Sequence, residues 1–258
     1  MANFHLEFKT ISRRQGRSPI SAANYQSGER LHDDYYGRTY YNRDKSDVLH
    51  TEVLLPLNIP PEYNNRQALW REVDKAEKRS DARTARRVIG SLPNELSLTE
   101  NIELVREYVT ENFISLGMCA DIAIHEIKNE DDPTRDNIHF HALLTDRPIT
   151  SNGFALKKNR DWNNRIKIKL WRERWAEAQN RAYERKGLNV RVTEKSYINR
   201  GVYKREPKRY LQPRDMILER SGIRTERGDE NREIKARNKE HKKRMLQKKR
   251  EKKRGRER

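Results

Sequence analysis

The sequence predicts a domain of mixed α and β structure that is followed by a basic C-terminal tail. Short segments alternate apolar and polar side chains as strands do, and longer segments repeat apolar residues with the helical period. The 258 residues suffice for one ordinary domain plus an extra segment, or for two small domains. Hydrophobic residues make up only 33% and charged residues 37%, so a core can form only if part of the chain stays outside it. We expect the folded domain at residues 1–215 and a basic linker with a helical or disordered tail at residues 216–258.

Alternating side chains locate the expected strands. In the first of them, Phe4, Leu6 and Phe8 share one face and would pack against a core. The expected strands cover residues 4–11, 48–57, 86–92, 121–127 and 137–145. Between the last two lies a polar stretch, which we expect to close a hairpin near Pro133.

The helical period and the capping residues locate the expected helices. Ser18 as N-cap and Pro19 at the first helical position predict the start of the first helix. Small residues near its start would let it pack close to the sheet and hold Tyr25 in place. The expected helices cover residues 20–30, 65–83, 100–116 with Thr99 as the cap, and a basic helix from 162 or 163 to 186. Trp171 and Trp175 share an apolar stripe of the last helix, so we interpret them as core residues and not as base-stacking platforms.

Three histidines form the candidate site. His139 and His141 point to one face of the strand at residues 137–145, and His125 is in phase on the preceding strand. If the two strands pair as a hairpin, His125 falls across from His141 and three imidazoles converge. Three neutral nitrogen ligands with room for water or substrate predict a metal site. The alternative interpretation is that the histidines are structural, because a half-buried strand can use them for packing or hydrogen bonding.

The charge of the chain predicts a polyanionic partner. The formal net charge is +18 and the pI is near 10.0, and nucleic acid is the usual partner of such a protein. Residues 230–258 hold fifteen Lys or Arg and five Glu, so they carry +10 and the rest of the chain +8. We expect this tail to be a frayed helix or disordered and to bind phosphates nonspecifically. The alternative is that its charged residues are merely solvated and have no part in binding. The basic segment at residues 157–186 is expected to follow the backbone of a single strand or hairpin.

The single cysteine and the hydropathy of the chain bear on its compartment. Cys119 excludes an intrachain disulfide, and its small and apolar neighbours indicate a buried side chain and not a nucleophile. The sequence has no run of eighteen apolar residues, and its start has no apolar block of the kind found in signal peptides. These features predict a cytoplasmic protein without membrane insertion.

A metal site in so basic a protein suggests a phosphodiester substrate, and its nucleophile would be either metal-bound water or a tyrosine. A tyrosine suits a reaction in which the broken phosphodiester must be resealed, because a phosphotyrosyl link keeps the energy of the broken bond, whereas hydrolysis by water would lose it. Tyr25 is the leading candidate, since its helix directly follows a strand that could lie beside the site. The alternatives lie in the polar segment at residues 31–47, a surface hairpin or long loop, and are Tyr35, Tyr36, Tyr40 and Tyr41.

Several segments resemble, in the same order, those of the MobA/MobL plasmid relaxases, which belong to the MobQ class of the HUH endonucleases. They are KTISR at residues 9–13, SAANYQSGE at 21–29, HTEVLLP at 50–56, LPNEL at 92–96 and NIHFH at 137–141, with Ser196-Tyr197 and Glu206-Pro207 downstream. The resemblance covers roughly residues 1 to 230. It implies an HUH relaxase-like fold, in which helices flank a central antiparallel sheet.

The resemblance also implies a function, that of a plasmid mobilisation relaxase. Such an enzyme nicks one strand at a transfer origin through a tyrosine, stays attached to the 5′ phosphate and later reseals the strand. The family's nucleophile falls on Tyr25, and its metal-binding histidines fall on His125, His139 and His141. Mg²⁺ or Mn²⁺ is the family's usual ion, although three imidazoles by themselves favour softer ions such as Zn²⁺. The implied partners are single-stranded or hairpin DNA at the origin, accessory relaxosome proteins and a type IV secretion coupling protein.

One departure from the family's pattern concerns an acid. Members often carry an acidic residue after the Ala-Arg that precedes the Leu-Pro-Asn-Glu stretch, and here Arg87 takes that position. If that acid normally assists the metal ion or the tyrosine, this protein either lacks the assistance or uses another acid for it, such as Glu77 or Asp121. Two further functions stay open: a rolling-circle replication initiator or transposase with the same chemistry, and a basic DNA-binding protein without enzymatic activity.

Overall fold

The computed structural model describes residues 4–42, 44–128, 136–196, 200 and 205–254. The chain divides into two compact units, Met1–Glu194 and Lys195–Arg258. The expected turn at Pro133, and Tyr197 of a downstream motif, lie outside the described residues. The strands are β1 (Leu6–Ser12), β2 (Leu31–Asp33), β3 (Arg38–Tyr40), β4 (Val48–Leu54), β5 (Arg83–Ser91), β6 (Ala120–Ile127), β7 (Asn137–Thr145), β8 (Ile149–Thr150) and β9 (Gly153–Phe154). The α-helices are α1 (Pro19–Ser27), α2 (Arg66–Ala76), α3 (Leu98–Asn112), α4 (Arg165–Arg185), α5 (Pro213–Arg220) and α6 (Glu226–Arg254).

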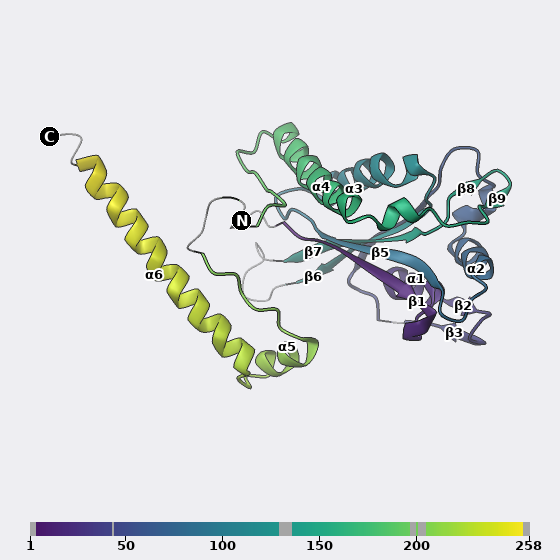
Figure 1. The fold of residues 1–258 in the computed structure, drawn as a ribbon, viewed down its shortest axis with the longest axis horizontal. Coiled ribbons are helices and arrows are strands. Elements are labelled where there is room, and N and C mark those ends of the chain that lie inside the picture. Colours follow the sequence, from purple (N-terminus) through teal and green to yellow (C-terminus); the bar gives the residue numbers. More distant parts are fainter. Residues whose placement is uncertain (1–3, 43, 129–135, 197–199, 201–204, 255–258) are drawn as a thin grey trace. The chain divides into compact units, whose positions relative to one another are not determined.

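A five-stranded sheet organises the first unit (Figure 1). Its strands lie in the order β1-β5-β7-β6-β4, and each neighbouring pair is antiparallel. The central antiparallel sheet flanked by helices is therefore confirmed. Strand β7 lies in the middle of the sheet, so the two histidines of this strand have a neighbouring strand on either side.

Helices α3 and α4 cover one face of the sheet (Figure 1). Trp171 and Trp175 of α4 are fully buried there, together with Tyr108 of α3 and Phe140 of β7. The ring of Trp175 lies 4.9 Å from that of Tyr108 and 5.0 Å from that of Phe140. The tryptophans of the basic helix are thus core residues, as expected, and its charged side chains surround them.

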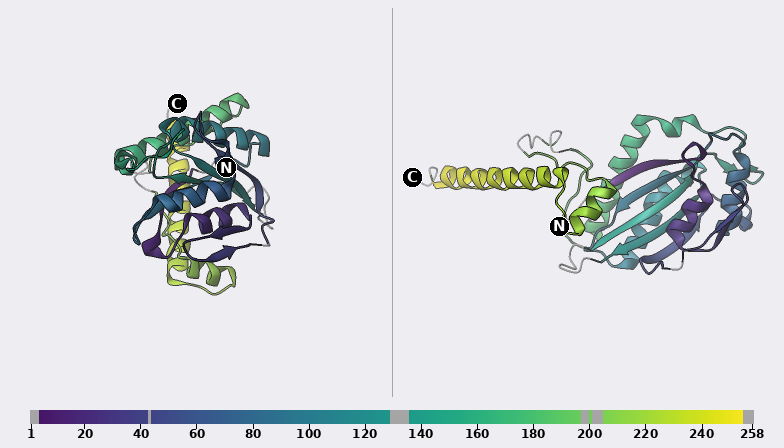
Figure 2. Two further views of the ribbon diagram at one scale, coloured as in Figure 1. Left: turned by 90° about the vertical axis from the view of Figure 1, so that its right-hand side faces the viewer. Right: turned by 90° about the horizontal axis from the view of Figure 1, so that it is seen from below.

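Helices α1 and α2 cover the opposite face, and α1 contacts both histidine-bearing strands (Figure 2). Ile20 and Ala23 of α1 pack with Trp70 of α2 and Leu143 of β7 in a second core cluster. The small side chain of Ala23 is fully buried, so the backbone of α1 approaches the sheet closely. This is the packing that the small residues of the helix predict.

Several helix boundaries differ from the expected ones, and two of the differences have a clear cause. Helix α2 ends at Ala76 and not near residue 83, because the Arg13 guanidinium takes the backbone carbonyls of Asp74 and Glu77 as hydrogen-bond acceptors at the helix end. Helix α3 starts at Leu98 with Ser97 as its N-cap, in a capping box with Glu100, so the prediction of Thr99 as the cap was wrong.

The second unit contains α5 and α6. Ion pairs join Arg232 of α6 to Glu219 of α5, and Arg237 of α6 to Glu206 of the preceding segment. Of the two states expected for the tail, a frayed helix or disorder, the structure has a helix from Glu226 to Arg254. Among the described residues, no helix combines the length and the apolar character that a membrane span requires.

Candidate metal centre

The pairing of β6 with β7 brings the three histidines together. His125 lies opposite His139, and Ala123 lies opposite His141. The expectation that His125 falls across from His141 was wrong: the register of the two strands differs by two residues from the expected one. The convergence itself is confirmed: the ring of His141 lies 4.6 Å from that of His125 and 5.0 Å from that of His139. Diagonal neighbours on one face of a sheet are close enough for such contacts.

The three side chains fit a bound metal ion. Each offers one ring nitrogen, and these atoms lie within 4.8 Å of one another. Burial lowers the pKa of His141 to about 2, with smaller effects from the charges of His125 and His139, and burial also lowers the pKa of His125. Unprotonated rings are what a metal ion requires. Both ring nitrogens of His141 are buried and have no hydrogen-bond partner among the described residues, a costly arrangement that a bound ion would relieve.

The outer contacts of the triad orient its rings. His125 Nε2 donates to the backbone oxygen of Gln26 at 2.7 Å, and His139 Nδ1 lies 3.0 Å from the backbone oxygen of Asn137. A carboxylate oxygen of Asp47 lies 3.3 Å from His125 Nδ1. The backbone contacts to Gln26 and Asn137 fix ring orientation and raise the basicity of a ligand. Because Nε2 of His125 carries the proton, Asp47 lies beside its unprotonated Nδ1.

The sequence analysis missed Asp47. It lies in the polar segment before β4, where no residue pattern marks it. Its backbone oxygen accepts a hydrogen bond from Glu126 of β6, so the start of β4 lies beside His125. If the expected strand at residues 48–57 is paired with the one at 121–127, the start of the first lies next to His125, and Asp47 can be predicted from this pairing.

Tyr25 lies next to the triad. Its ring centroid is 6.1 Å from that of His141, with the two rings nearly perpendicular, and half of the side chain is exposed. The following residue, Gln26, anchors this part of α1, because its side-chain amide donates to the backbone oxygen of Asp121 at 2.8 Å. The structure thus holds an accessible phenol beside three buried or partly buried imidazoles.

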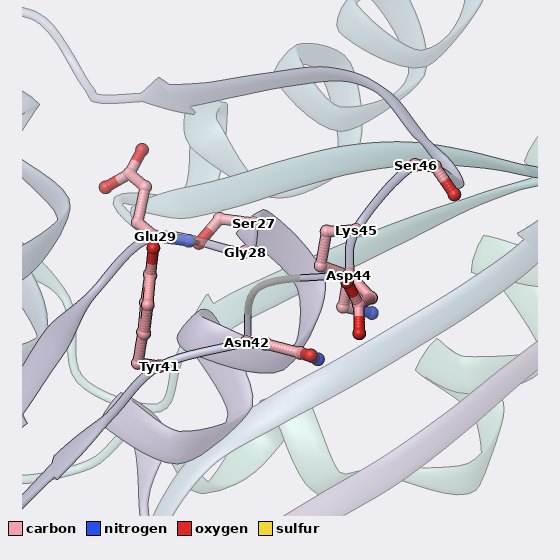
Figure 3. Close-up of a pocket in the computed structure, with 8 residues that line it drawn as sticks. All are labelled: Ser27, Gly28, Glu29, Tyr41, Asn42, Asp44, Lys45 and Ser46. Atoms are coloured by element: carbon pink, nitrogen blue, oxygen red, sulfur yellow. Dashed lines mark hydrogen bonds between the residues drawn. The ribbon is translucent and has the colours of Figure 1, made fainter.

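The other candidate nucleophiles lie elsewhere. The rings of Tyr35 and Tyr36 contact each other at 4.9 Å, and Tyr40 packs against the core cluster of α1 and α2. Tyr41 lines an open pocket of about 560 Å³, where its side chain lies beside Glu29, and Asn42, Asp44, Lys45 and Ser46 also line this pocket (Figure 3). Burial raises the pKa of Cys119 to about 12, which confirms that this thiol is not a nucleophile.

The two carboxylates considered as substitutes for the family's acid are both engaged by cations. Glu77 pairs with Arg147 at 2.7 Å and with Lys158 at 3.0 Å. Asp121 is fully buried and accepts hydrogen bonds from Arg66 and Trp70, each at 2.8 Å. Asp47, by contrast, has a carboxylate oxygen 3.3 Å from a ring nitrogen of His125, so it is an acid that the structure places beside the triad.

Comparison with known proteins identifies the family. Residues 17–220 match the model of the MobA/MobL family. The chain belongs to the MobA/MobL family. This match covers Tyr25, the three histidines and every strand of the sheet except β1.

Named relatives and a solved structure agree with this family. The chain is 31% identical over 232 residues to "Probable conjugal transfer protein TraA" of Sinorhizobium fredii, covering 78% of this chain and 20% of that protein. It is 31% identical over 247 residues to "Mobilization protein MobL" of Acidithiobacillus ferridurans, covering 85% of this chain and 64% of that protein. A solved structure described as "Molecular Basis of Vancomycin Resistance Transfer in Staphylococcus aureus" is 33% identical with a TM-score of 0.69, covering 76% of this chain and all of that one. The chain spans about a fifth of the length of the TraA proteins.

Proposed function

We propose that this MobA/MobL protein is a relaxase that nicks one DNA strand at a plasmid transfer origin and later reseals it. The observation that carries the proposal is the accessible phenol of Tyr25 beside His125, His139 and His141, whose nitrogens are arranged to hold an ion. The names of the relatives, which describe mobilisation and conjugal transfer, support the same function.

In this proposal Tyr25 is the nucleophile. Its oxygen forms a bond to the phosphorus of the scissile phosphodiester, and the 3′ oxygen of the preceding nucleotide leaves. The products are a 5′-phosphotyrosyl adduct and a free 3′ hydroxyl, and attack by such a hydroxyl on the adduct reseals the strand. Because the helix around Tyr25 is anchored through Gln26, the phenol keeps its place for both reactions.

The proposed ligands of the metal are His125, His139 and His141. A divalent ion bound to them would polarise a phosphoryl oxygen and offset the charge that builds up in the transition state. We propose Mg²⁺ or Mn²⁺ as the working ion, as the resemblance to the family implies, although three imidazole nitrogens alone favour Zn²⁺.

The proposed partners follow from this function. They are single-stranded or hairpin DNA of a transfer origin, accessory relaxosome proteins and a type IV secretion coupling protein, and the proposed compartment is the cytoplasm. The basic residues of α4 and of the preceding loop are the proposed track for the DNA backbone.

A covalent-adduct assay tests the nucleophile. Wild-type protein and the Tyr25→Phe variant are incubated with Mn²⁺ and end-labelled single-stranded origin DNA, and the products are separated on a denaturing gel. We expect a protein-linked band with the wild type, no such band with Tyr25→Phe, and DNA binding of the variant within a few-fold of the wild type. Tyr41→Phe, which changes a tyrosine of the nearby pocket, serves as the control and should retain the band. An undiminished band with Tyr25→Phe would refute the assignment.

A further inference from the structure

Two consecutive arginines of β5 point to opposite faces of the sheet. Arg86 is buried on the side of α4, where it donates to the backbone oxygen of Trp162, to the Asn163 side chain at 2.7 Å and to Asp146 at 3.4 Å. Its guanidinium is therefore satisfied within the protein, and its role is structural.

Arg87 lies on the face of the sheet that carries the histidines, and its guanidinium has no such hydrogen-bond acceptors among the described residues. It pairs with Leu143, and the next residue on this face of β5, Ile89, pairs with His141, so Arg87 and His141 are diagonal neighbours. The side chain is partly buried, and its Nε atom is fully buried without an acceptor. Among the described residues, none forms a hydrogen bond or an ion pair with the side chain of Arg87. A partly desolvated guanidinium without an acceptor is costly unless an anionic ligand completes it.

A second cation, that of Lys45, lies close to the phenol of Tyr25. Lys45 Nζ is 4.2 Å from the ring centroid of Tyr25, and its side chain is only 13% exposed. The stem of this lysine packs so closely on Gly28 that a Cβ there would lie 2.9 Å from it. The ion partner of Lys45 among the described residues is Asp47, at 3.9 Å. Figure 3 shows the segment that carries Lys45 alongside the end of α1.

We propose that Arg87 is a catalytic residue that binds the non-bridging oxygens of the scissile phosphodiester while Tyr25 attacks it, with Lys45 as the second cation of the same phosphate site. This inference rests on the proposed function and names the group that recognises the reacting phosphate. Arg87 is close enough for its charge to act on both Tyr25 and His141.

The chemistry of the step explains why a guanidinium suits this position. As the bond from the Tyr25 oxygen to phosphorus forms and the bond to the 3′ oxygen breaks, negative charge is spread over the equatorial oxygens. Arg87 donates two parallel hydrogen bonds to these oxygens and transfers no proton. Because the guanidinium is partly desolvated, its attraction to this charge is stronger than in water.

The first test compares rates of adduct formation. Arg87→Gln removes the charge, and Arg87→Lys keeps the charge but loses the planar fork. Lys75→Gln, which removes an exposed cation of α2 paired with Glu72, is the control for net charge. We expect adduct formation to slow about 100-fold in Arg87→Gln, as when one preorganised donor is removed, and to slow less in Arg87→Lys. Lys75→Gln should match the wild type.

The second test asks whether Arg87 acts on the phosphate itself. In the Tyr25→Phe background, Arg87→Gln is titrated with two single-stranded oligonucleotides, one normal and one with a neutral methylphosphonate at the scissile position. We expect Arg87→Gln to weaken binding of the normal strand about tenfold and to leave binding of the methylphosphonate strand unchanged. The methylphosphonate has no negative charge at the scissile position, so Arg87 has no charge there to interact with. Equal losses with both strands, or no loss with either, would overturn the inference.

Two controls separate the possible failures. Arg87→Gln breaks no internal hydrogen bond, so its melting temperature should not fall below that of the wild type, whereas Arg86→Gln should be clearly destabilised. If the wild type forms no adduct with origin DNA, the proposed function fails. If the wild type and Arg87→Gln form it at the same rate, only the role of Arg87 fails.

Discussion

His141 is held unprotonated by its surroundings, and this makes the metal-free protein sensitive to acid. The pKa of the ring is about 2 in the folded chain, mainly because of burial, against an ordinary value of 6.5. Between these values the unfolded chain binds a proton that the folded chain does not bind. The contribution of His141 to folding stability is therefore fully present above pH 6.5 and is lost as the pH drops toward the folded pKa.

We expect the loss from His141 to approach about 1.4 kcal/mol per pH unit once the unfolded ring is protonated. Thermal unfolding in a chelator, followed from neutral to mildly acidic pH, measures it. His141→Leu, which cannot titrate, should show a shallower loss than the wild type, and replacing the exposed His32 by Gln should change little. Equal slopes for the wild type and His141→Leu would contradict the prediction.

The carboxylate of Asp47 is the outer contact whose removal tests the metal site most directly. Asp47→Asn keeps the size of the side chain but loses the charge that lies 3.3 Å from His125. Loss of a partner of this kind weakens metal binding about 10- to 100-fold. Calorimetric titration with Mn²⁺ measures the change, and Asp44→Asn, an exposed acid of the same segment, is the matched control. Unchanged Mn²⁺ affinity in Asp47→Asn would remove Asp47 from the site.

At the scale of the elements, the position of the histidine pair depends on how β7 packs. Phe140 lies between His139 and His141 in the sequence and points to the opposite face, into the core under α3 and α4. A glycine on the neighbouring strand makes room for its ring: a Cβ on Gly90 would overlap the ring of Phe140 and would lie 2.9 Å from Leu6. The strand that carries the ligands is thus fixed from the other side of the sheet.

We expect Gly90→Ala to destabilise the protein by about 1–3 kcal/mol, as overpacked cores do, and to weaken Mn²⁺ binding because Phe140 must shift. Differential scanning calorimetry and metal titration measure the two effects. Adding Phe140→Leu, which makes space for the new methyl group, should restore part of the lost stability, so the double variant should be less destabilised than the sum of the single variants. Strict additivity would show that the overlap with Phe140 is not the cause.

At the scale of the whole molecule, the C-terminal helix is polar on all sides and strongly basic. Its first half is bonded within the second unit, through Arg237 to Glu206 and through Asn231 to Arg209. Residues 239–258 hold twelve Lys or Arg and three Glu, a net charge of +9. A truncation after residue 238 therefore removes most of the tail charge and leaves those bonds in place.

We expect this truncation to flatten the dependence of DNA affinity on salt, by about 0.7 in the logarithmic slope for each phosphate of a single strand that the tail no longer neutralises. The position of the nick should not change, because the described site residues lie in the first unit. Fluorescence anisotropy over a range of salt concentrations and a sequencing gel make the two measurements. A full-length variant with Gln at the Lys and Arg positions of 239–254 controls for length. Altered choice of the cleavage position would contradict this division of roles.

The sequence by itself determined where the strands of the sheet and the helices packed on it lie, apart from their ends, and which side chains share a face. Period-two alternation put His139 and His141 on one face of a strand, and no packing detail was needed for that. Small residues predicted the close approach of α1, and the apolar stripe predicted the buried tryptophans of α4. These features are local, because the periods of a strand and of a helix are properties of a few consecutive residues.

The tertiary structure alone decided the features that depend on residues far apart in the chain. The register of β6 with β7 placed His125 opposite His139, and a guanidinium from the end of β1, that of Arg13, ended α2 earlier than its sequence suggests. The start of β4 brought Asp47 to His125. The pairing of β5 with β7 put Arg87 on the face of the histidines, while Arg86 found its acceptors on the other face, in the segment before α4 and at Asp146. Register and long-range hydrogen bonds are set by packing between elements, so no pattern of neighbouring residues carries them.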